Sequence, residues 1–468
     1  MCPFYDMKPT LFKTSNGNRY IYSPKNKTFL PLSEQVYKEI IECKEPHSKE
    51  YNILLRYGYL DNFIPKYHCH VLASDIKHSL SNIPQVIFEV TSACNLRCEY
   101  CCYGHGYETF KNRKHGNLSF ESAKKILHYL VKLSKGDFNS SYNTPFVISF
   151  YGGEPLLNID VIKKIVEYSK TLDFNGRILR FSMTTNATHL AENIDFLKKN
   201  DFSLLVSLDG DKTANQHRKL PNGDNSFDEI MRNLNIIRAK YPDYFSTIRY
   251  NSVYTDVSDT QNLLDFFKKE LNTSPTINAL HEPDVNAPEY EAIQKMLKKI
   301  SQPSSVNEIS DFLQIPLQRR IIDIIHKLSK NYQHSESDYF EPEQIDSYPT
   351  GTCVPFSKRL FVTTDGAILP CEKICRDNPL GIIDSEGVHI DEQVIADSFN
   401  QSLNETINQC SQCYMQQCCN QCIHNFKKGH CNSFMNQTRF ATILSEAFSY
   451  IELHPDTINI LEENTILR

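Results

Sequence analysis

The chain has 468 residues, of which 40% are hydrophobic, and its 50 basic and 56 acidic side chains leave a formal net charge of −6. This length predicts two to four domains with a substantial core, and the mildly acidic balance disfavours a nucleic-acid partner. The N-terminus lacks a basic segment followed by an apolar run, and no stretch has the apolar length of a membrane span, so we expect a cytoplasmic protein without a membrane partner. Sixteen cysteines in a reducing compartment favour metal binding over disulfides.

Residues 1–70 are predicted to form a small, winged-helix-like domain. Two apolar runs flank Asn16-Gly17, which is typical of a hairpin turn, and a third strand is expected at 28–30. Ser33 would then cap an amphipathic helix. This order resembles the PqqD-like domains that recognise precursor peptides, which implies that a leader peptide adds as a strand to an open sheet edge. A hairpin that only covers the catalytic domain is the alternative.

Strand-like and helical runs alternate between residues 84 and 300, which indicates a parallel sheet curved into a partial (β/α)6 barrel and hence an α/β fold. The active site of such a barrel lies at the carboxyl ends of its strands. Residues 301–350 are polar and mixed, and we interpret them as a bridging segment. The six predicted strands lie at 86–90, 146–150, 179–183, 204–208, 248–253 and 276–280.

A CxxxCxxC run follows the first of these strands and consists of Cys94, Cys98 and Cys101. Three thiolates at this spacing can hold three irons of a cubane cluster and leave the fourth iron without a protein ligand. Structural zinc sites usually use two CxxC pairs, and disulfides belong to secreted proteins, so neither explains the run well. An iron without a protein ligand indicates a catalytic cluster. Cys102 lies outside the run, and we interpret it as a packed small residue.

With Tyr100 between the last two cysteines, the run resembles the CxxxCx-aromatic-C motif of the radical S-adenosylmethionine (SAM) enzymes. The resemblance implies that the open iron binds the amino and carboxylate groups of SAM. One electron then cleaves SAM to a 5′-deoxyadenosyl radical, which abstracts a hydrogen atom. It also implies an electron donor such as flavodoxin or ferredoxin, and a barrel of the radical SAM type from 84 to 300.

Two further motifs end the second and third strands. After the second strand, a GGEP run matches the family element that binds the SAM amino group, although the same four residues are also a common turn. Thr185 and Asn186 end the third strand at a position that contacts the ribose in the family, and a plain polar turn is the alternative. The GGEP residues are Gly152, Gly153, Glu154 and Pro155.

The fourth strand ends in an SxDG sequence that includes Ser207 and Asp209, with Arg218 following. It resembles the SxDG…HxxxR segment of peptide- and sulfatase-modifying members, which implies that Ser207 and Arg218 hold the SAM carboxylate. The spacing before Arg218 is shorter here than in the family. Asp209 is a candidate acid or base at the substrate, and an aspartate that caps a turn is the alternative.

A second cysteine field resembles the SPASM domain, which holds two auxiliary 4Fe-4S clusters and brings the expected total to three. The resemblance implies a domain at 351–435, followed by a helical tail at 436–468. Asp365-Gly366 is predicted to form a hairpin turn within it. A zinc ribbon built from CxxC pairs is the alternative. One auxiliary cluster would take Cys353, Cys371 and Cys422, with Cys375 a further candidate, and the other Cys410, Cys413, Cys431 and either Cys418 or Cys419.

Together these resemblances imply a radical SAM peptide maturase that forms a thioether or carbon-carbon crosslink in a ribosomally made precursor peptide. Two alternatives stay open. One is an anaerobic sulfatase-maturating enzyme, which oxidises a cysteine or serine to formylglycine. The other is a non-catalytic iron-sulfur electron carrier or peptide-binding protein. Auxiliary clusters favour a net oxidation, so the expected product is lighter than the precursor by two hydrogens for each crosslink.

Overall fold

The computed structural model divides the chain into two units. Unit 1 comprises Met1–Val71, Leu317–Thr352 and Asp397–Arg468, and unit 2 comprises Leu72–Pro316 and Cys353–Ala396. The candidate ligands Cys375 and Cys418 lie outside the described residues, as does most of the predicted bridge at 301–350. The structure describes residues 6–42, 47–64, 70–104, 107, 113–280, 290–298, 321, 324–325, 328, 351, 353–374, 376–377, 379–416, 419, 421–425, 431 and 433–455.

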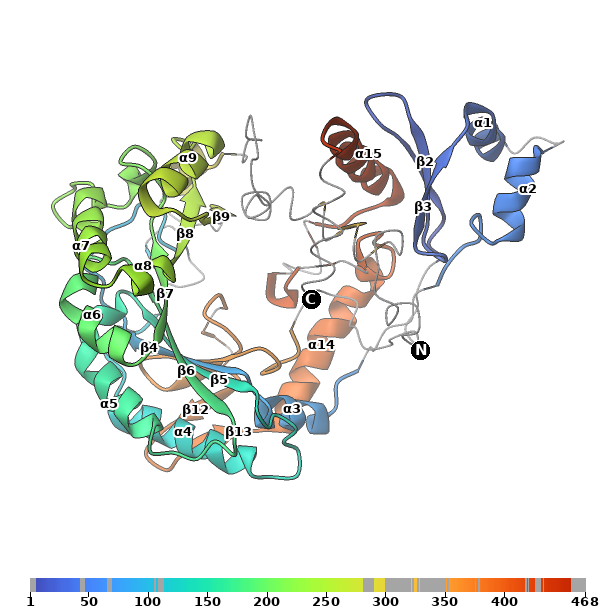
Figure 1. Ribbon diagram of the computed structural model, residues 1–468. Helices are drawn as coiled ribbons and strands as arrows, with labels where there is room; N and C mark the ends of the chain where they lie inside the picture. Colours follow the sequence, from blue (N-terminus) through green and yellow to red (C-terminus); the bar gives the residue numbers. More distant parts are fainter. Residues whose placement is uncertain are drawn as a thin grey trace. The chain divides into compact units, whose positions relative to one another are not determined.

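Unit 2 is built on a sheet in which six parallel strands lie side by side in chain order, as the sequence predicts (Figure 1). The first strand, β4 (Gln85–Thr91), is buried at six of its seven positions, which is typical of a parallel strand covered on both faces. The α/β fold of radical SAM type is thereby confirmed in its sheet order. The other five strands are β5 (Pro145–Gly152), β6 (Ile178–Thr185), β7 (Phe202–Ser207), β8 (Arg249–Tyr254) and β9 (Thr276–Ala279).

Helices connect the parallel strands and follow the outer side of the sheet (Figure 1). The first of them, α4 (Phe120–Ser134), begins where the Ser119 side chain accepts a hydrogen bond from the Ser122 N–H at 3.0 Å. Its inward face, which includes Ile126 and Leu130, is fully buried. The remaining helices of unit 2 are α3 (Ala73–Ser81), α5 (Ile159–Ser169), α6 (Leu190–Lys199), α7 (Phe227–Lys240), α8 (Pro242–Ser246), α9 (Thr260–Leu271) and α10 (Tyr290–Met296).

The sheet continues past β4 through four short strands, of which the first two flank the predicted hairpin turn and the last two were not predicted. β10 (Leu360–Val362) pairs in parallel with β4, and β11 (Ala367–Leu369) pairs antiparallel with β10. The predicted turn at Asp365-Gly366 joins these two strands, with Gly366 at a φ of +86°. β12 (Gly381–Ile383) and β13 (Val388–Ile390) complete the edge. The segment that carries Cys371 is therefore attached directly to the barrel sheet.

Unit 1 contains the predicted N-terminal strands and helix. β1 (Thr10–Lys13), β2 (Arg19–Ser23) and β3 (Thr28–Leu32) form an antiparallel sheet with the hairpin turn at Asn16-Gly17, and Ser33 precedes the next helix. Among the described residues, no other strand pairs with the outer edge of β3. The helices with described bounds are α1 (Glu34–Glu42), α2 (Lys49–Arg56), α14 (Glu392–Cys410), which begins in unit 2, and α15 (Gln437–Leu453).

Helix α15 completes the core of this N-terminal sheet, although more than 400 residues separate the two in the sequence. The Phe448 ring lies 5.1 Å from the ring of Phe12 and 4.9 Å from that of Phe29. The α15 residue Glu452 accepts hydrogen bonds from Asn18 at 3.0 Å and from Tyr20 at 2.9 Å.

None of the helices described in either unit is long and apolar enough to cross a membrane.

Candidate functional site

Cys94, Cys98 and Cys101 lie on the loop that leaves the carboxyl end of β4, and all three are free thiols. Burial raises the pKa of Cys98 and that of Cys101 to about 12. Cys102 packs against a hydrophobic cluster that includes Tyr100, as expected for a residue outside the motif. We call residues 94–101 the cysteine loop. Three largely buried thiols on one loop are poor free nucleophiles, and metal coordination is what would deprotonate them.

No three His, Cys, Asp or Glu side chains among the described residues lie close enough to hold a single metal ion. A cubane cluster makes a different demand, because each thiolate ligates a different iron and the sulfur atoms stand further apart. The lack of a single-ion group among the described residues therefore does not bear on a cluster at the cysteine loop.

The GGEP turn at the end of β5 packs directly on the backbone that precedes the cysteine loop. Glu154 N–H donates to the carbonyl of Ala93 at 2.8 Å. A Cβ at Gly153 would lie 2.0 Å from that same carbonyl oxygen, and Gly152 has a φ of +145°, which a side chain would strain. The two glycines thus allow the close backbone approach that fixes the position of Cys94.

The carboxylate of Glu154 joins this turn to the end of β6. The side chain is fully buried, and it accepts hydrogen bonds from Thr185 Oγ1 and from the Asn186 N–H, each at 2.7 Å. Burial raises the pKa of Glu154, while these hydrogen bonds act in the opposite direction. Pro155 follows and begins a short 3-10 helix, Pro155–Asn158. The predicted residues of the second and third strands therefore meet at one point.

Asn186 also reaches the cysteine loop. Its Nδ2 lies 3.9 Å from Cys94 Sγ and donates to Asn95 Oδ1 at 2.9 Å. Asn95 in turn donates to Thr188 Oγ1 at 2.8 Å. The sequence analysis did not single out Asn95 or Thr188, because a polar residue inside a metal-binding motif or a turn carries no signal of its own.

Tyr100, Asp209 and Arg218 form a buried polar group beside the cysteines. The Tyr100 hydroxyl donates to the Asp209 carboxylate, and Arg218 Nη1 donates to the Tyr100 oxygen at 3.0 Å. The same Nη1 lies 3.8 Å from Asp209 Oδ1. Burial raises the pKa of Asp209. Arg218 Nε is buried without a hydrogen-bond partner, so this guanidinium has donor capacity that the protein does not use.

Burial disfavours the charge on Arg218, but Tyr100, Cys98 and Asp209 outweigh it and raise the pKa of the guanidinium well above its ordinary value. A permanent positive charge therefore lies beside the thiol of Cys98. Ser207 was predicted to hold the SAM carboxylate together with Arg218. It is the last residue of β7 and pairs with Asn251 of β8.

The segment around Arg218 is hydrogen-bonded to the cysteine loop through the backbone. Glu99 N–H donates to the His217 carbonyl at 3.0 Å, and Arg97 N–H donates to the Lys219 carbonyl at 2.7 Å. The His217 ring lies between two carboxylates, 2.5 Å from Glu99 and 2.8 Å from Asp256. The sequence analysis did not predict these contacts, because Glu99, His217 and Asp256 come from three separate parts of the chain.

Four cysteines of the second field gather in unit 1. Burial, together with the nearby thiols of Cys419, Cys413 and Cys431, raises the pKa of Cys410 to about 12. This group contains the predicted set Cys410, Cys413 and Cys431 together with Cys419. Cys422 also belongs to unit 1, whereas Cys353 and Cys371 belong to unit 2.

Residues 88–267 match the radical SAM superfamily. The chain is 26% identical over 346 residues to a cysteine-type anaerobic sulfatase-maturating enzyme from Clostridium novyi, covering 70% of this chain and 81% of the relative. It is 30% identical over 161 residues to an uncharacterised protein from Methanocaldococcus jannaschii, covering 34% of this chain and only 50% of that protein. The radical SAM cyclopropyl synthase TigE from Paramaledivibacter caminithermalis is 24% identical over 187 residues, covering 39% of this chain and 36% of that enzyme.

Among solved structures, the fold is similar to that of native anSMEcpe with bound AdoMet. The TM-score is 0.53 at 17% identity, and the match covers 81% of this chain and 98% of that one. The same protein with AdoMet and the Cp18Cys peptide matches with a TM-score of 0.53 at 18% identity. The strand order, the cysteine loop at the end of β4 and the superfamily match agree. The chain therefore contains a radical SAM domain that is homologous to those of the anaerobic sulfatase-maturating enzymes.

Proposed function

We propose that this chain is a radical SAM enzyme that modifies a peptide. The observation that carries the proposal is the hydrogen bond of Arg218 to Tyr100 within the cysteine loop, which leaves the Arg218 Nε–H without a partner among the described residues. A 4Fe-4S cluster with SAM at its open iron would supply a 5′-deoxyadenosyl radical for hydrogen abstraction.

The residues of the site fit such a group. Cys94, Cys98 and Cys101 would hold the cluster, and Arg218 would place a positive charge and a free donor where an anionic cluster or a SAM carboxylate needs them. The Asn186 amide would donate toward the Cys94 sulfur. Asp209 is fully buried with Tyr100 and Arg218 as partners, so we assign it the role of holding Arg218 in place.

A peptide substrate is supported by two relatives. A match that covers 70% of this chain is to a sulfatase-maturating enzyme, and a solved structure of similar fold is described with a bound peptide. We propose specifically that the substrate is a ribosomally made precursor and that the product is a crosslink, more readily a cysteine thioether than a carbon-carbon bond. A flavodoxin or ferredoxin would supply electrons in the cytoplasm.

The leader of this precursor would bind to the outer edge of β3 as an added strand. Adding the precursor peptide to the full chain should slow hydrogen exchange at residues 28–32 and leave β6 unchanged. Equal exchange at 28–32 with and without the peptide would exclude this docking edge.

Anaerobic sulfatase maturation is the second candidate, because the sulfatase-maturating relative matches over 70% of this chain. High-resolution mass spectrometry of the treated peptide separates the two, with and without thiol alkylation. A crosslink removes two hydrogens and retains the sulfur, and a thioether also protects one cysteine from alkylation. Conversion of cysteine to formylglycine loses the sulfur. Conversion of serine to formylglycine also removes two hydrogens, but it leaves an aldehyde that a hydrazine reagent labels, which a crosslink does not. A product of unchanged mass would contradict both oxidative reactions.

We also propose two auxiliary clusters, and hence three clusters per chain. The grouping of Cys410, Cys413, Cys419 and Cys431 in unit 1 supports one of them, with Cys418 or Cys419 as the fourth ligand. The other would use Cys371 and Cys353 of unit 2. About four irons per chain after anaerobic reconstitution, instead of about twelve, would refute this count.

A further inference from the structure

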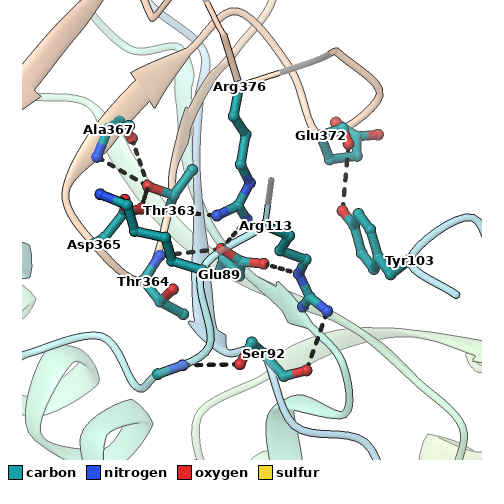
Figure 2. A network of polar contacts seen from close by, with 12 residues as sticks. Glu89, Ser92, Tyr103, Arg113, Thr363, Thr364, Asp365, Ala367, Glu372 and Arg376 are labelled. Atoms are coloured by element: carbon teal, nitrogen blue, oxygen red, sulfur yellow. Dashed lines mark hydrogen bonds and ion pairs between the residues drawn. The ribbon is translucent and has the colours of Figure 1, made fainter. Parts of the chain in front are cut away.

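A buried ion network joins β4 to the segment that carries Cys371 (Figure 2). At its centre, the carboxylate of Glu89 is fully buried. Arg113 Nε donates to it at 2.7 Å, Arg376 donates to its other oxygen, and the Thr364 N–H donates to that same oxygen at 3.0 Å. One carboxylate of β4 thus binds Arg113 and a segment, 364–376, that lies more than 270 residues away in the sequence.

These segments border the cysteine loop on one side and Cys371 on the other. Glu89 lies on the strand that leads into the cysteine loop, and Arg113 also donates to the carbonyl of Ser92 at 3.1 Å, just before that loop. Arg376 lies shortly after Cys371. The network therefore fixes the Cys371 segment relative to the entrance of the cysteine loop.

A second contact joins the residues just after the cysteine loop to the residues just after Cys371. Tyr103, which follows closely after Cys101, donates through its hydroxyl to the carbonyl of Glu372 at 3.3 Å (Figure 2). The guanidinium of Arg113 lies 4.1 Å from the centre of the Tyr103 ring, so Arg113 contacts both Glu89 and Tyr103.

Among the described residues, the network carries more positive than negative buried charge. The side chains of Arg113 and Arg376 are 8% and 9% exposed, and both bind the fully buried carboxylate of Glu89. Asp365 lies 3.7 Å from Arg376 but is partly exposed. Arg113 Nη2 and Arg376 Nη1 are buried without hydrogen-bond partners. An excess buried charge of this kind is costly unless an anionic group lies near it.

We infer that Glu89 is a positioning residue that fixes the Cys371 segment against the cysteine loop, and that Arg113 and Arg376 raise the reduction potential of a cluster held at Cys371. Nearby positive charge favours the reduced, more negative state of an iron-sulfur cluster. The positioning role stands on the contacts alone. The effect on the potential rests on the proposed auxiliary site.

The positioning role is tested by hydrogen exchange on the full chain after anaerobic reconstitution. In Glu89→Gln, exchange over residues 360–374 should be faster by tenfold or more, whereas β7 should be unchanged. Glu121→Gln, on the exposed surface of α4, is the matched control and should leave both segments as in the wild type. Unchanged exchange over 360–374 in Glu89→Gln would overturn the inference.

If Glu89→Gln does not fold, Tyr103→Phe replaces it, because this change removes only the hydroxyl that binds the Glu372 carbonyl. Faster exchange should then be confined to residues 371–374. Wild-type exchange there would show that the contact does not hold the segment.

The charge effect is tested by redox titrations followed by electron paramagnetic resonance. Glu89→Gln should raise the midpoint potential of the cluster at Cys371, and Arg376→Met should lower it. A purely structural network would shift both variants in the same direction or shift neither, and either result would refute the charge effect. A wild-type chain with iron only at the cysteine loop would refute the auxiliary site, while the exchange result would still decide the positioning role.

Discussion

The guanidinium of Arg218 donates a hydrogen bond to the phenol oxygen of Tyr100 at 3.0 Å, so that a residue beyond β7 is attached to the middle of the cysteine loop. The Asp209 carboxylate binds both partners. This buried arrangement places a fixed positive charge next to Cys98 and leaves Arg218 Nε free to donate.

Replacing Arg218 by methionine should weaken SAM binding by about 10- to 100-fold, because a hydrogen bond to a charged group contributes about 1.5–3 kcal/mol. The change also leaves Asp209 without its cation, so the double variant Arg218→Met, Asp209→Asn serves as the control for folding. Equilibrium binding of SAM to the reconstituted chain is the measurement. Wild-type affinity in a folded Arg218→Met variant would exclude Arg218 as a SAM contact.

Replacing Gly153 by alanine should displace the cysteine loop, because the new Cβ would lie 2.0 Å from the carbonyl oxygen of Ala93. We expect a loss of at least about 2 kcal/mol of unfolding free energy, together with reduced iron uptake. Gly116→Ala is the matched control, since nothing lies within 4 Å of its added Cβ. Equal stability and iron content in the two variants would show that the close contact at Gly153 is unimportant.

Replacing Glu452 by glutamine should loosen α15 from the N-terminal sheet in a pH-dependent way. Burial raises the pKa of Glu452, but hydrogen bonds, that from Asn18 first among them, outweigh it and hold the pKa below its ordinary value of 4.5. A lowered pKa stabilises the fold above that value, and the contribution is lost as the pH falls through the folded pKa.

Thermal unfolding of wild type and Glu452→Gln should therefore differ by about 1 kcal/mol near neutral pH, and the difference should shrink in acid. A difference that stays constant as the pH falls below 4.5 would mean that the charge on Glu452 does not contribute.

The parallel sheet was predictable because each strand is a short apolar run bounded by turns and separated from the next by a helical pattern. The short strands β10 and β11 could be located only through the turn at Asp365-Gly366 between them. β12 and β13 were not predicted, because strands of three residues have no periodicity to detect, and they pair with β11 and with each other. The docking of α15 on β1 was equally invisible, since it depends on contacts across the whole chain.

The candidate site was likewise predictable only in part. The cysteine spacing, the GGEP turn and Arg218 could be located from the sequence because each is a local pattern at a strand end. The partners of those residues could not be located, because Asn95, Thr188 and His217 act only through contacts with distant elements. Glu89 gave no signal either, since a single glutamate in an apolar strand does not indicate that two arginines will meet it.

The most direct measurement is the formation of 5′-deoxyadenosine from SAM by the anaerobically reconstituted, reduced chain. We expect the wild type and the control Cys102→Ala to form it. The triple variant Cys94→Ala, Cys98→Ala, Cys101→Ala should form none while keeping the iron bound by the second cysteine field. Formation of 5′-deoxyadenosine by the triple variant, or its absence from the reduced wild type, would contradict radical SAM chemistry at the cysteine loop.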